Sequence, residues 1–236
     1  MRARPKPAAD GGSDQSGAEA EERDLFSVWD EPTLARVLPA DRRPQSFRKW
    51  WEAHAARTSA VCRISFLLFI SVLAGPVSVI TTFVETALRG GLLVVSVVGM
   101  VFLGPAIEEI AKTVLLALAI EAKPYMFRRR LEILLCGLCS ALGFAAIENV
   151  LYLEVYIEDP TRAIALWRWT VCVGMHAIAT LLTATGLARE WARAWEEGRR
   201  PEPGRAFAWL VAATAFHGIY NAAVLVEEWF DLLPRV

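Results

Sequence analysis

LLVVSVVGMVFLGPAIEEIAKTVLLALAI, residues 92–120, decides the fold, because this long apolar run carries Glu108, Glu109 and Lys112 near its middle. It exceeds the roughly 20 apolar residues that a membrane-spanning helix needs. On an insertion scale each charged group at mid-membrane costs roughly 3 kcal/mol, or about 9 kcal/mol for three. The surrounding Val, Leu, Ile and Phe residues return about 0.3–0.6 kcal/mol each, on the order of 7 kcal/mol together. Alone, the segment is marginal in lipid, and it therefore predicts polar partners on other helices.

One apolar block precedes this stretch and three follow it. The 236-residue chain is 55% hydrophobic and its mean hydropathy is +0.35, which is rich for a soluble domain. The apolar residues gather in five blocks, 63–85, 91–120, 131–154, 163–188 and 206–228. The sequence thus predicts an all-α fold, a polytopic transmembrane helical bundle with about five spans. In the second span, Gly104-Pro105 is expected to kink the helix or to make its first half re-entrant.

The N-terminal part of the chain has a different composition. Residues 1–25 are rich in Ala, Gly, Ser, Glu and Asp, which predicts a disordered tail. Residues 26–60 mix tryptophans with many charges and are expected to form a cytoplasmic juxtamembrane segment with a short helix or two. Residues 61–230 then form the multi-span membrane domain. No apolar signal-peptide core is found in the first 60 residues, so no cleaved secretory leader is expected.

The charges of the short loops predict the orientation. Lys and Arg cluster before the first block, after the second and after the fourth, whereas the loop 154–162 is acidic and the loop after the first block has only Arg89. By the positive-inside rule, this alternation places the N-terminus in the cytoplasm and the C-terminus outside. We therefore expect a multi-pass protein of the cell membrane, with the lipid bilayer and no nucleic acid as a partner.

Polar residues inside the later blocks are few, and they are the candidate partners of the two adjacent glutamates. Three blocks contribute pairs of them, Glu148 with Asn149, His176 with Thr180, and His217 with Asn221. Ionisable residues inside a membrane face the bundle interior or a water-filled cavity and mark function by default. Two His and a Glu form a common ligand set of catalytic zinc. A metal-free alternative has a carboxylate activate water while His and Asn stabilise the oxyanion.

Structural explanations of the same residues stay open at this point. Glu108 and Lys112 are four residues apart, as in a simple intrahelical ion pair. A single membrane His often serves only in packing and hydrogen bonding. The row Gly137, Ala141 and Ala145 has the small-xxx-small spacing that allows close helix approach, and this row leads to Asn149.

Four motifs, taken in order, resemble those of the PrsW family of intramembrane proteases. That family lies within a larger group with the CAAX-processing and bacteriocin-processing membrane proteases and the APH-1 scaffold. The motifs are GPAIEEIAK (104–112, like EExxK), GFAAIEN (143–149, like GFAxxEN), HAIAT (176–180) and HGIYN (217–221, like HxxxN). The CAAX branch is expected to show FxxxH in the second motif, where this chain has Phe144 followed by Glu148. PrsW proteins usually have more spans than the five counted here.

The resemblance implies an endopeptidase that cuts a single-span membrane protein in or beside its transmembrane segment. One family member starts the degradation of an anti-sigma factor. Six residues would be catalytic: Glu108, Glu109, Glu148, His176, His217 and Asn221. Glu108 or Glu109 would be the water-activating base, and Asn221 would polarise the scissile carbonyl. Glu148, His176 and His217 would hold Zn²⁺ if the enzyme is a metalloprotease rather than a glutamate-type protease, with Lys112, Asn149 and Thr180 as structural polar residues.

Two other classes of function compete with a protease. A catalytically silent membrane scaffold like APH-1 is disfavoured because both glutamates of EExxK and both histidines are present. An ion or proton transporter would use the same carboxylates, but it favours a longer chain with an inverted repeat, which is not evident in this sequence.

Overall fold

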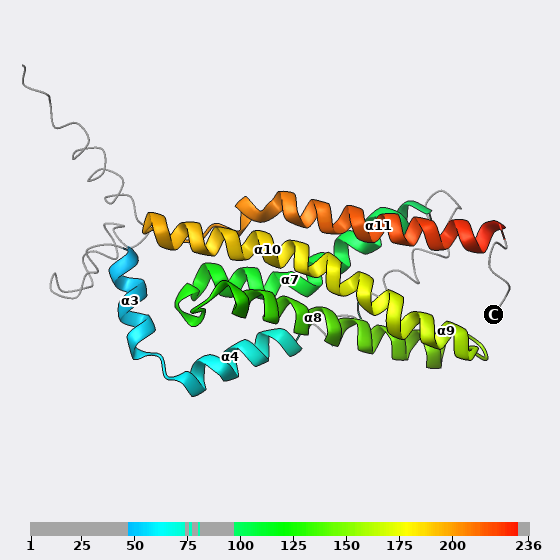
Figure 1. Ribbon diagram of the computed structural model, residues 1–236, viewed down its shortest axis with the longest axis horizontal. Coiled ribbons are helices and arrows are strands. Elements are labelled where there is room, and N and C mark those ends of the chain that lie inside the picture. Colours follow the sequence, from blue (N-terminus) through cyan, green and yellow to red (C-terminus); the bar gives the residue numbers. More distant parts are fainter. Residues whose placement is uncertain (1–46, 74–75, 77–79, 81–96, 231–236) are drawn as a thin grey trace, which may run out of the picture. The chain divides into compact units, whose positions relative to one another are not determined.

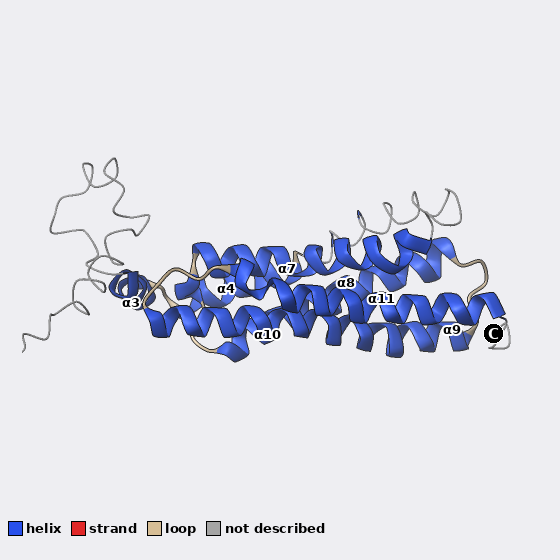
Figure 2. Ribbon diagram, turned by 90° about the horizontal axis from the view of Figure 1, so that it is seen from above, coloured by secondary structure: helices blue, strands red, loops and turns tan. Residues whose placement is uncertain are grey.

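The computed structural model of the chain describes residues 47–73, Pro76, Ile80 and residues 97–230. These residues are helical with short connections, and none of them is in a strand, as the sequence predicts. The predicted disordered tail, most of the juxtamembrane segment and the junction of the first two predicted spans lie outside the described residues. Residues from Trp51 onward belong to one compact unit, and the helices below lie within it apart from residues 47–50 (Figures 1 and 2).

Seven α-helices lie in the described ranges. They are α3 Phe47–Arg57, α4 Ala60–Val72, α7 Gly104–Ala122, α8 Arg130–Leu151, α9 Arg162–Trp167, α10 Val173–Glu197 and α11 Phe207–Phe230. Helix ends follow local chemistry. The Ser59 side chain caps α4 by accepting a hydrogen bond from the Cys62 amide, and Thr161 caps α9 in the same way. Helix α10 ends at Gly198, whose φ of 67° is a left-handed conformation that glycine adopts without steric cost.

Three π-helical turns interrupt the long helices on one side of the polar residues. They are η3 Gly99–Leu103 before α7, η5 Tyr152–Tyr156 after α8 and η6 Arg168–Cys172 before α10. Residues Val98, Leu103 and Gly104 all keep right-handed helical backbone angles. Gly104-Pro105 therefore does not end the helix, and the wider turn η3 lies where the proline lacks its N–H. Whether the span is re-entrant depends on residues before Val97, outside the described ranges.

Three continuous helical segments are long and apolar enough to cross a membrane, namely Arg130–Tyr156, Arg162–Glu197 and Pro203–Glu227. They correspond to the third, fourth and fifth predicted spans. Helices α3 and α4 meet at 103° and make a fourth candidate if this bent pair counts as one span. Helix α7 is not among the three, and it carries Glu108, Glu109, Lys112 and Glu121. The chain is therefore a membrane protein with three to four candidate spans among its described residues.

Helix α10 packs against α7, α8 and α11, which run alongside it in both views (Figures 1 and 2). Small residues permit this packing. A Cβ on Gly137 of α8 would lie 2.7 Å from the Cβ of Ala184 on α10, and Ala141 and Ala145 in the same row are fully buried. The predicted small-residue row therefore lies in a helix interface. Where α11 crosses η3, a Cβ on Gly218 would collide with the carbonyl oxygen of Val101.

Large apolar side chains point outward along the spans, including Leu131, Leu135 and Leu142 of α8, Ile178 of α10 and Ile219 of α11. A bilayer solvates such an apolar surface, while backbone polar groups are satisfied inside the helices. The polar residues, by contrast, are turned inward.

Helix α10 with its preceding turns is longer than the hydrocarbon core of a bilayer is thick. The segment Arg162–Glu197 has 36 residues, so it is about 54 Å long, against a hydrocarbon core of roughly 30 Å. Its C-terminal part is held by an aromatic cluster in which the ring of Trp51 lies edge-on to Trp191 and Trp195, at centroid distances of 5.7 and 5.1 Å. The Trp191 indole N–H also donates to the carbonyl of Pro124 at 3.0 Å.

Candidate active site

The structure brings together nearly all the polar residues that the sequence singles out. Helix α7 contributes Glu108, Glu109 and Lys112, α8 contributes Glu148 and Asn149, α10 contributes His176 and Thr180, and α11 contributes His217. Each of these eight residues is 7% exposed or less. Because charged groups without partners are costly in a membrane interior, their contacts decide what the cluster can do.

Lys112 is the cation at the centre of the cluster. Its Nζ donates to Oε2 of Glu108 at 3.1 Å and to Oε1 of Glu109 at 2.8 Å. The same Nζ is 2.8 Å from Nδ1 of His176 and 4.3 Å from the ring centroid of Phe144. The intrahelical ion pair expected from the sequence exists, but Lys112 also bonds across to α10, so it is part of the site.

His176 lies between two carboxylates. Its Nε2 is 2.8 Å from Oε2 of Glu148, and its Nδ1 is 3.7 Å from Oε2 of Glu108. The Glu148 contact is close but poorly aligned, since Oε2 has no partner that meets hydrogen-bond geometry among the described residues. We therefore treat it as an electrostatic contact, one that favours a proton on Nε2 and leaves the Nδ1 lone pair toward Lys112.

His217 is oriented in a similar way by Glu109. Its Nδ1 lies 3.1 Å from Oε1 of Glu109, while its Nε2 lies 3.9 Å from Oε2 of Glu108. The Glu109 carboxylate is an acceptor, so Nδ1 donates and the Nε2 lone pair faces Glu108. Each histidine thus turns one nitrogen to a carboxylate of its own and the other toward Glu108.

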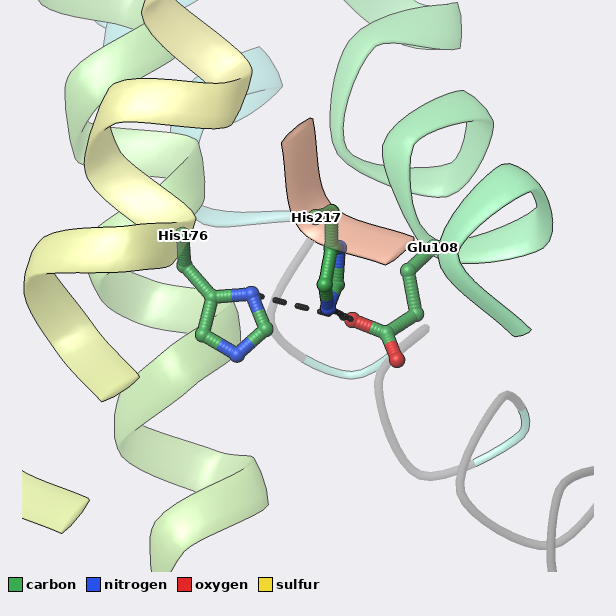
Figure 3. Close-up of side chains that lie close together, drawn as sticks. All are labelled: Glu108, His176 and His217. Atoms are coloured by element: carbon green, nitrogen blue, oxygen red, sulfur yellow. Dashed lines mark ion pairs between the residues drawn. The ribbon is translucent and has the colours of Figure 1, made fainter. Parts of the chain in front are cut away.

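Glu108, His176 and His217 each place a ligand atom within 4.8 Å of the others. Figure 3 shows these three side chains converging from three helices. Two ligands of a tetrahedral zinc, each about 2.1 Å from the ion, lie roughly 3.4 Å apart. The observed 3.7 and 3.9 Å between Glu108 and the two histidines are close to that spacing, and the donor types suit zinc. The set differs from the predicted one, because Glu108 rather than Glu148 approaches both histidines.

The adjacent glutamates occupy different environments. Glu109 is fully buried and accepts from Lys112, from His217 and, at 3.1 Å through Oε2, from the Thr180 hydroxyl. Glu108 accepts only through Oε2, from Lys112, and its Oε1 makes no hydrogen bond to any other described residue. Of the two carboxylates, Glu108 is therefore the one with an oxygen available to another molecule.

The two asparagines hold π-helical turns. Asn149 Nδ2 donates to the carbonyl of Arg168 in η6 at 3.0 Å, and Asn221 Nδ2 donates to the carbonyl of Met100 in η3 at 2.9 Å. Asn149 is completely buried, whereas Asn221 is partly exposed. The structure does not join Asn221 to the carboxylates, so its predicted role toward a substrate carbonyl stays a prediction.

Sequence reasoning missed two residues of the site. Phe144 packs its ring against Lys112 and lies 5.7 Å from the His176 ring, and Ser140 donates to the Lys112 carbonyl at 2.6 Å. Their spacing offers a signal, since Ser140, Phe144 and Glu148 are four residues apart on one face of α8. Arg168 lies 3.9 Å from Glu148, and its guanidinium stacks on Tyr152.

Residues 59–234 match the family model described as "PrsW family intramembrane metalloprotease". No curated protein and no solved structure matches the chain.

Proposed function

Because the chain belongs to the PrsW family, whose model matches well over half of it, we propose that it hydrolyses a peptide bond in or beside the transmembrane segment of a single-span membrane protein. The observation that carries the proposal is the convergence of Glu108, His176 and His217 from three helices. A membrane interior tolerates such a cluster at high cost, which a passive bundle has no reason to bear. An anti-sigma factor with one transmembrane helix is a suitable substrate.

In the glutamate-type form of the proposed reaction, which needs no metal, Glu108 is the base. Its Oε1, which has no hydrogen-bond partner among the described residues, takes a proton from the attacking water and later delivers that proton to the leaving nitrogen. The Nε2 lone pair of His217 faces the Glu108 carboxylate and orients the water beside it. Glu109 holds His217 and Lys112 in position, and Glu148 does the same for His176. Asn221, which is partly exposed, polarises the scissile carbonyl.

The residues that would hold a zinc ion are Glu108, His176 and His217. When bound there, zinc supplies a Lewis acid that polarises the scissile carbonyl. The contacts of Glu148 and Glu109 on the far nitrogens of the two histidines support this set, because metal-ligating histidines usually have a carboxylate or carbonyl partner.

The proposal is tested with purified protein in detergent and a panel of single-span membrane proteins as substrates. We expect Glu108→Gln and His217→Ala to lower cleavage at least 100-fold, while Glu132→Gln on α8, outside the cluster, leaves it unchanged. Unchanged cleavage by folded Glu108→Gln and His217→Ala proteins would refute the site. Loss of cleavage in chelator, restored by zinc, identifies a metalloprotease, whereas full cleavage in chelator identifies a glutamate-type protease.

We also infer five spans, with the N-terminus in the cytoplasm and the C-terminus outside. The support is the distribution of Lys and Arg among the loops and the outward apolar side chains of α8, α10 and α11. A reporter enzyme that is active only outside the cell should work when it is fused to the C-terminus and fail when it is fused to the loop after α10. The reverse result contradicts this topology.

A further inference from the structure

Lys112 makes its contacts with the atoms that a metal ion would use. Its Nζ is 2.8 Å from Nδ1 of His176 and 3.1 Å from Oε2 of Glu108. These two atoms lie 3.7 Å apart and belong to the convergent Glu/His/His group. A third contact, 2.8 Å to Oε1 of Glu109, fixes the ammonium from the other side.

The ammonium and a metal ion cannot share His176. A ring nitrogen has one lone pair, and at Nδ1 that lone pair accepts the N–H of Lys112. The other nitrogen, Nε2, is directed at Glu148, at 2.8 Å. The ring therefore has no second site to offer on the side of Glu108, and one cation excludes the other.

The charge of the cluster explains why some cation must be there. Glu108, Glu109 and Glu148 are buried together, and among the described residues Lys112 is the cation within hydrogen-bond distance of any of them. Arg168 approaches Glu148 only to 3.9 Å. Buried carboxylates without a nearby cation are strongly destabilising, so removal of Lys112 leaves a demand for positive charge that a divalent ion can meet.

We propose that Lys112 takes the place of the metal ion in the metal-free protein and is displaced from His176 when zinc binds, an inference that rests on the metal site of the proposed function. Lys112 then loses the bonds to His176 and Glu108 but keeps Glu109 and the face of the Phe144 ring. Lys112 is thus an occupancy-determining residue. It keeps the metal-free site ordered. It also lowers the apparent zinc affinity, which equals the intrinsic affinity multiplied by the fraction of molecules in which His176 is free.

The test compares zinc binding by the full-length protein in detergent with and without this side chain. Lys112→Met keeps the length of the side chain and removes its charge and donors. If Lys112 holds His176 in nine of ten molecules, the variant binds zinc about tenfold more tightly than wild type. In chelator, the variant has the lower melting temperature, and added zinc raises its melting temperature more than that of wild type. Lys123→Met, a lysine outside the cluster, is the matched control and should behave as wild type.

Zinc affinity that is equal or weaker in Lys112→Met overturns the proposal. If that variant folds only with zinc, both proteins are loaded with zinc and the rate of zinc loss to a chelator is measured. A loss about tenfold slower from the variant than from wild type supports the proposal. An equal or faster loss overturns it. Failure of the proposed function gives a different pattern: zinc affinity differs between Lys112→Met and wild type, but wild type cleaves no substrate. Cleavage without zinc binding by either protein overturns this inference and leaves a glutamate-type protease.

Discussion

Glu148 and His176 join α8 directly to α10, with Oε2 of the carboxylate 2.8 Å from Nε2 of the ring. This contact places the other ring nitrogen toward Glu108 and His217. In a metal site, a carboxylate in this position fixes the tautomer and the orientation of the ligand histidine.

Replacing Glu148 should therefore weaken metal binding without removing a ligand. We expect Glu148→Gln to lower zinc affinity about 10- to 100-fold, as measured by competition with a chelator of known affinity. Glu132→Gln is the matched control, because Glu132 is on the same helix and pairs with Arg63 instead. Equal zinc affinity in Glu148→Gln and Glu132→Gln would show that Glu148 has no such role.

Asn221 is predicted to stabilise the oxyanion of the reaction. We expect Asn221→Ala to lower kcat about 10²- to 10³-fold with little change in KM. Asn149→Ala provides the comparison, since it also removes a side-chain amide that donates a hydrogen bond to a main-chain carbonyl of a π-helical turn. Asn149→Ala should lower the melting temperature and affect kcat far less. Similar kcat values for the two variants would make Asn221 only a structural residue.

Gly218 should not tolerate a side chain, because its Cβ would meet the Val101 carbonyl oxygen where α11 crosses η3. We expect Gly218→Ala to destabilise the protein by about 1–3 kcal/mol, which thermal or denaturant unfolding in detergent would detect. Gly143→Ala is the control on α8, where no described atom outside the local helix backbone lies within 4 Å of the added Cβ. That change should be neutral or stabilise by about 0.5–1 kcal/mol, as expected for Gly to Ala in a helix. A stable Gly218→Ala protein would contradict the close crossing.

Trp51 should anchor the extended end of α10. It is 2% exposed and contacts both Trp191 and Trp195. We expect Trp51→Ala to cost about 3–5 kcal/mol and to make the C-terminal part of α10 sensitive to limited proteolysis. Trp169→Ala, at a position 46% exposed, should leave that part resistant. Resistance in Trp51→Ala as well would show that the cluster does not hold the helix end.

The sequence predicts the helical fold and the members of the site for one physical reason. Charged groups are so costly in lipid that the few present, such as Glu109 and His217, must lie together in the bundle interior. The apolar blocks likewise locate the three spans that the structure describes. Small residues such as Gly137 indicate which face of α8 packs against another helix.

The pairing inside the site could not be predicted in the same way. It depends on the rotation of each helix about its axis, where a shift of one residue turns a side chain by about 100°. The sequence places Glu148 among the metal ligands, whereas in the structure Glu108 is the carboxylate that lies near both histidines. The sequence pairs Lys112 with Glu108 by their spacing along one helix, and that spacing does not reveal the approach of His176 from another helix.

The three π-helical turns change how the side chains on either side of each turn are rotated about the helix axis. A π-helical turn holds about one residue more than an α-helical turn, so η3, η5 and η6 each act as a single-residue insertion within a helix that carries a site residue. In η6 the extra residue lies between Arg168 and His176, and it offsets the stacked arginine from the histidine by the equivalent of roughly 100°. The π-helical ends of the three helices and their polar centres are thus rotated relative to each other about the helix axes. One helix can therefore present one face to lipid at that end and another face to the buried cluster.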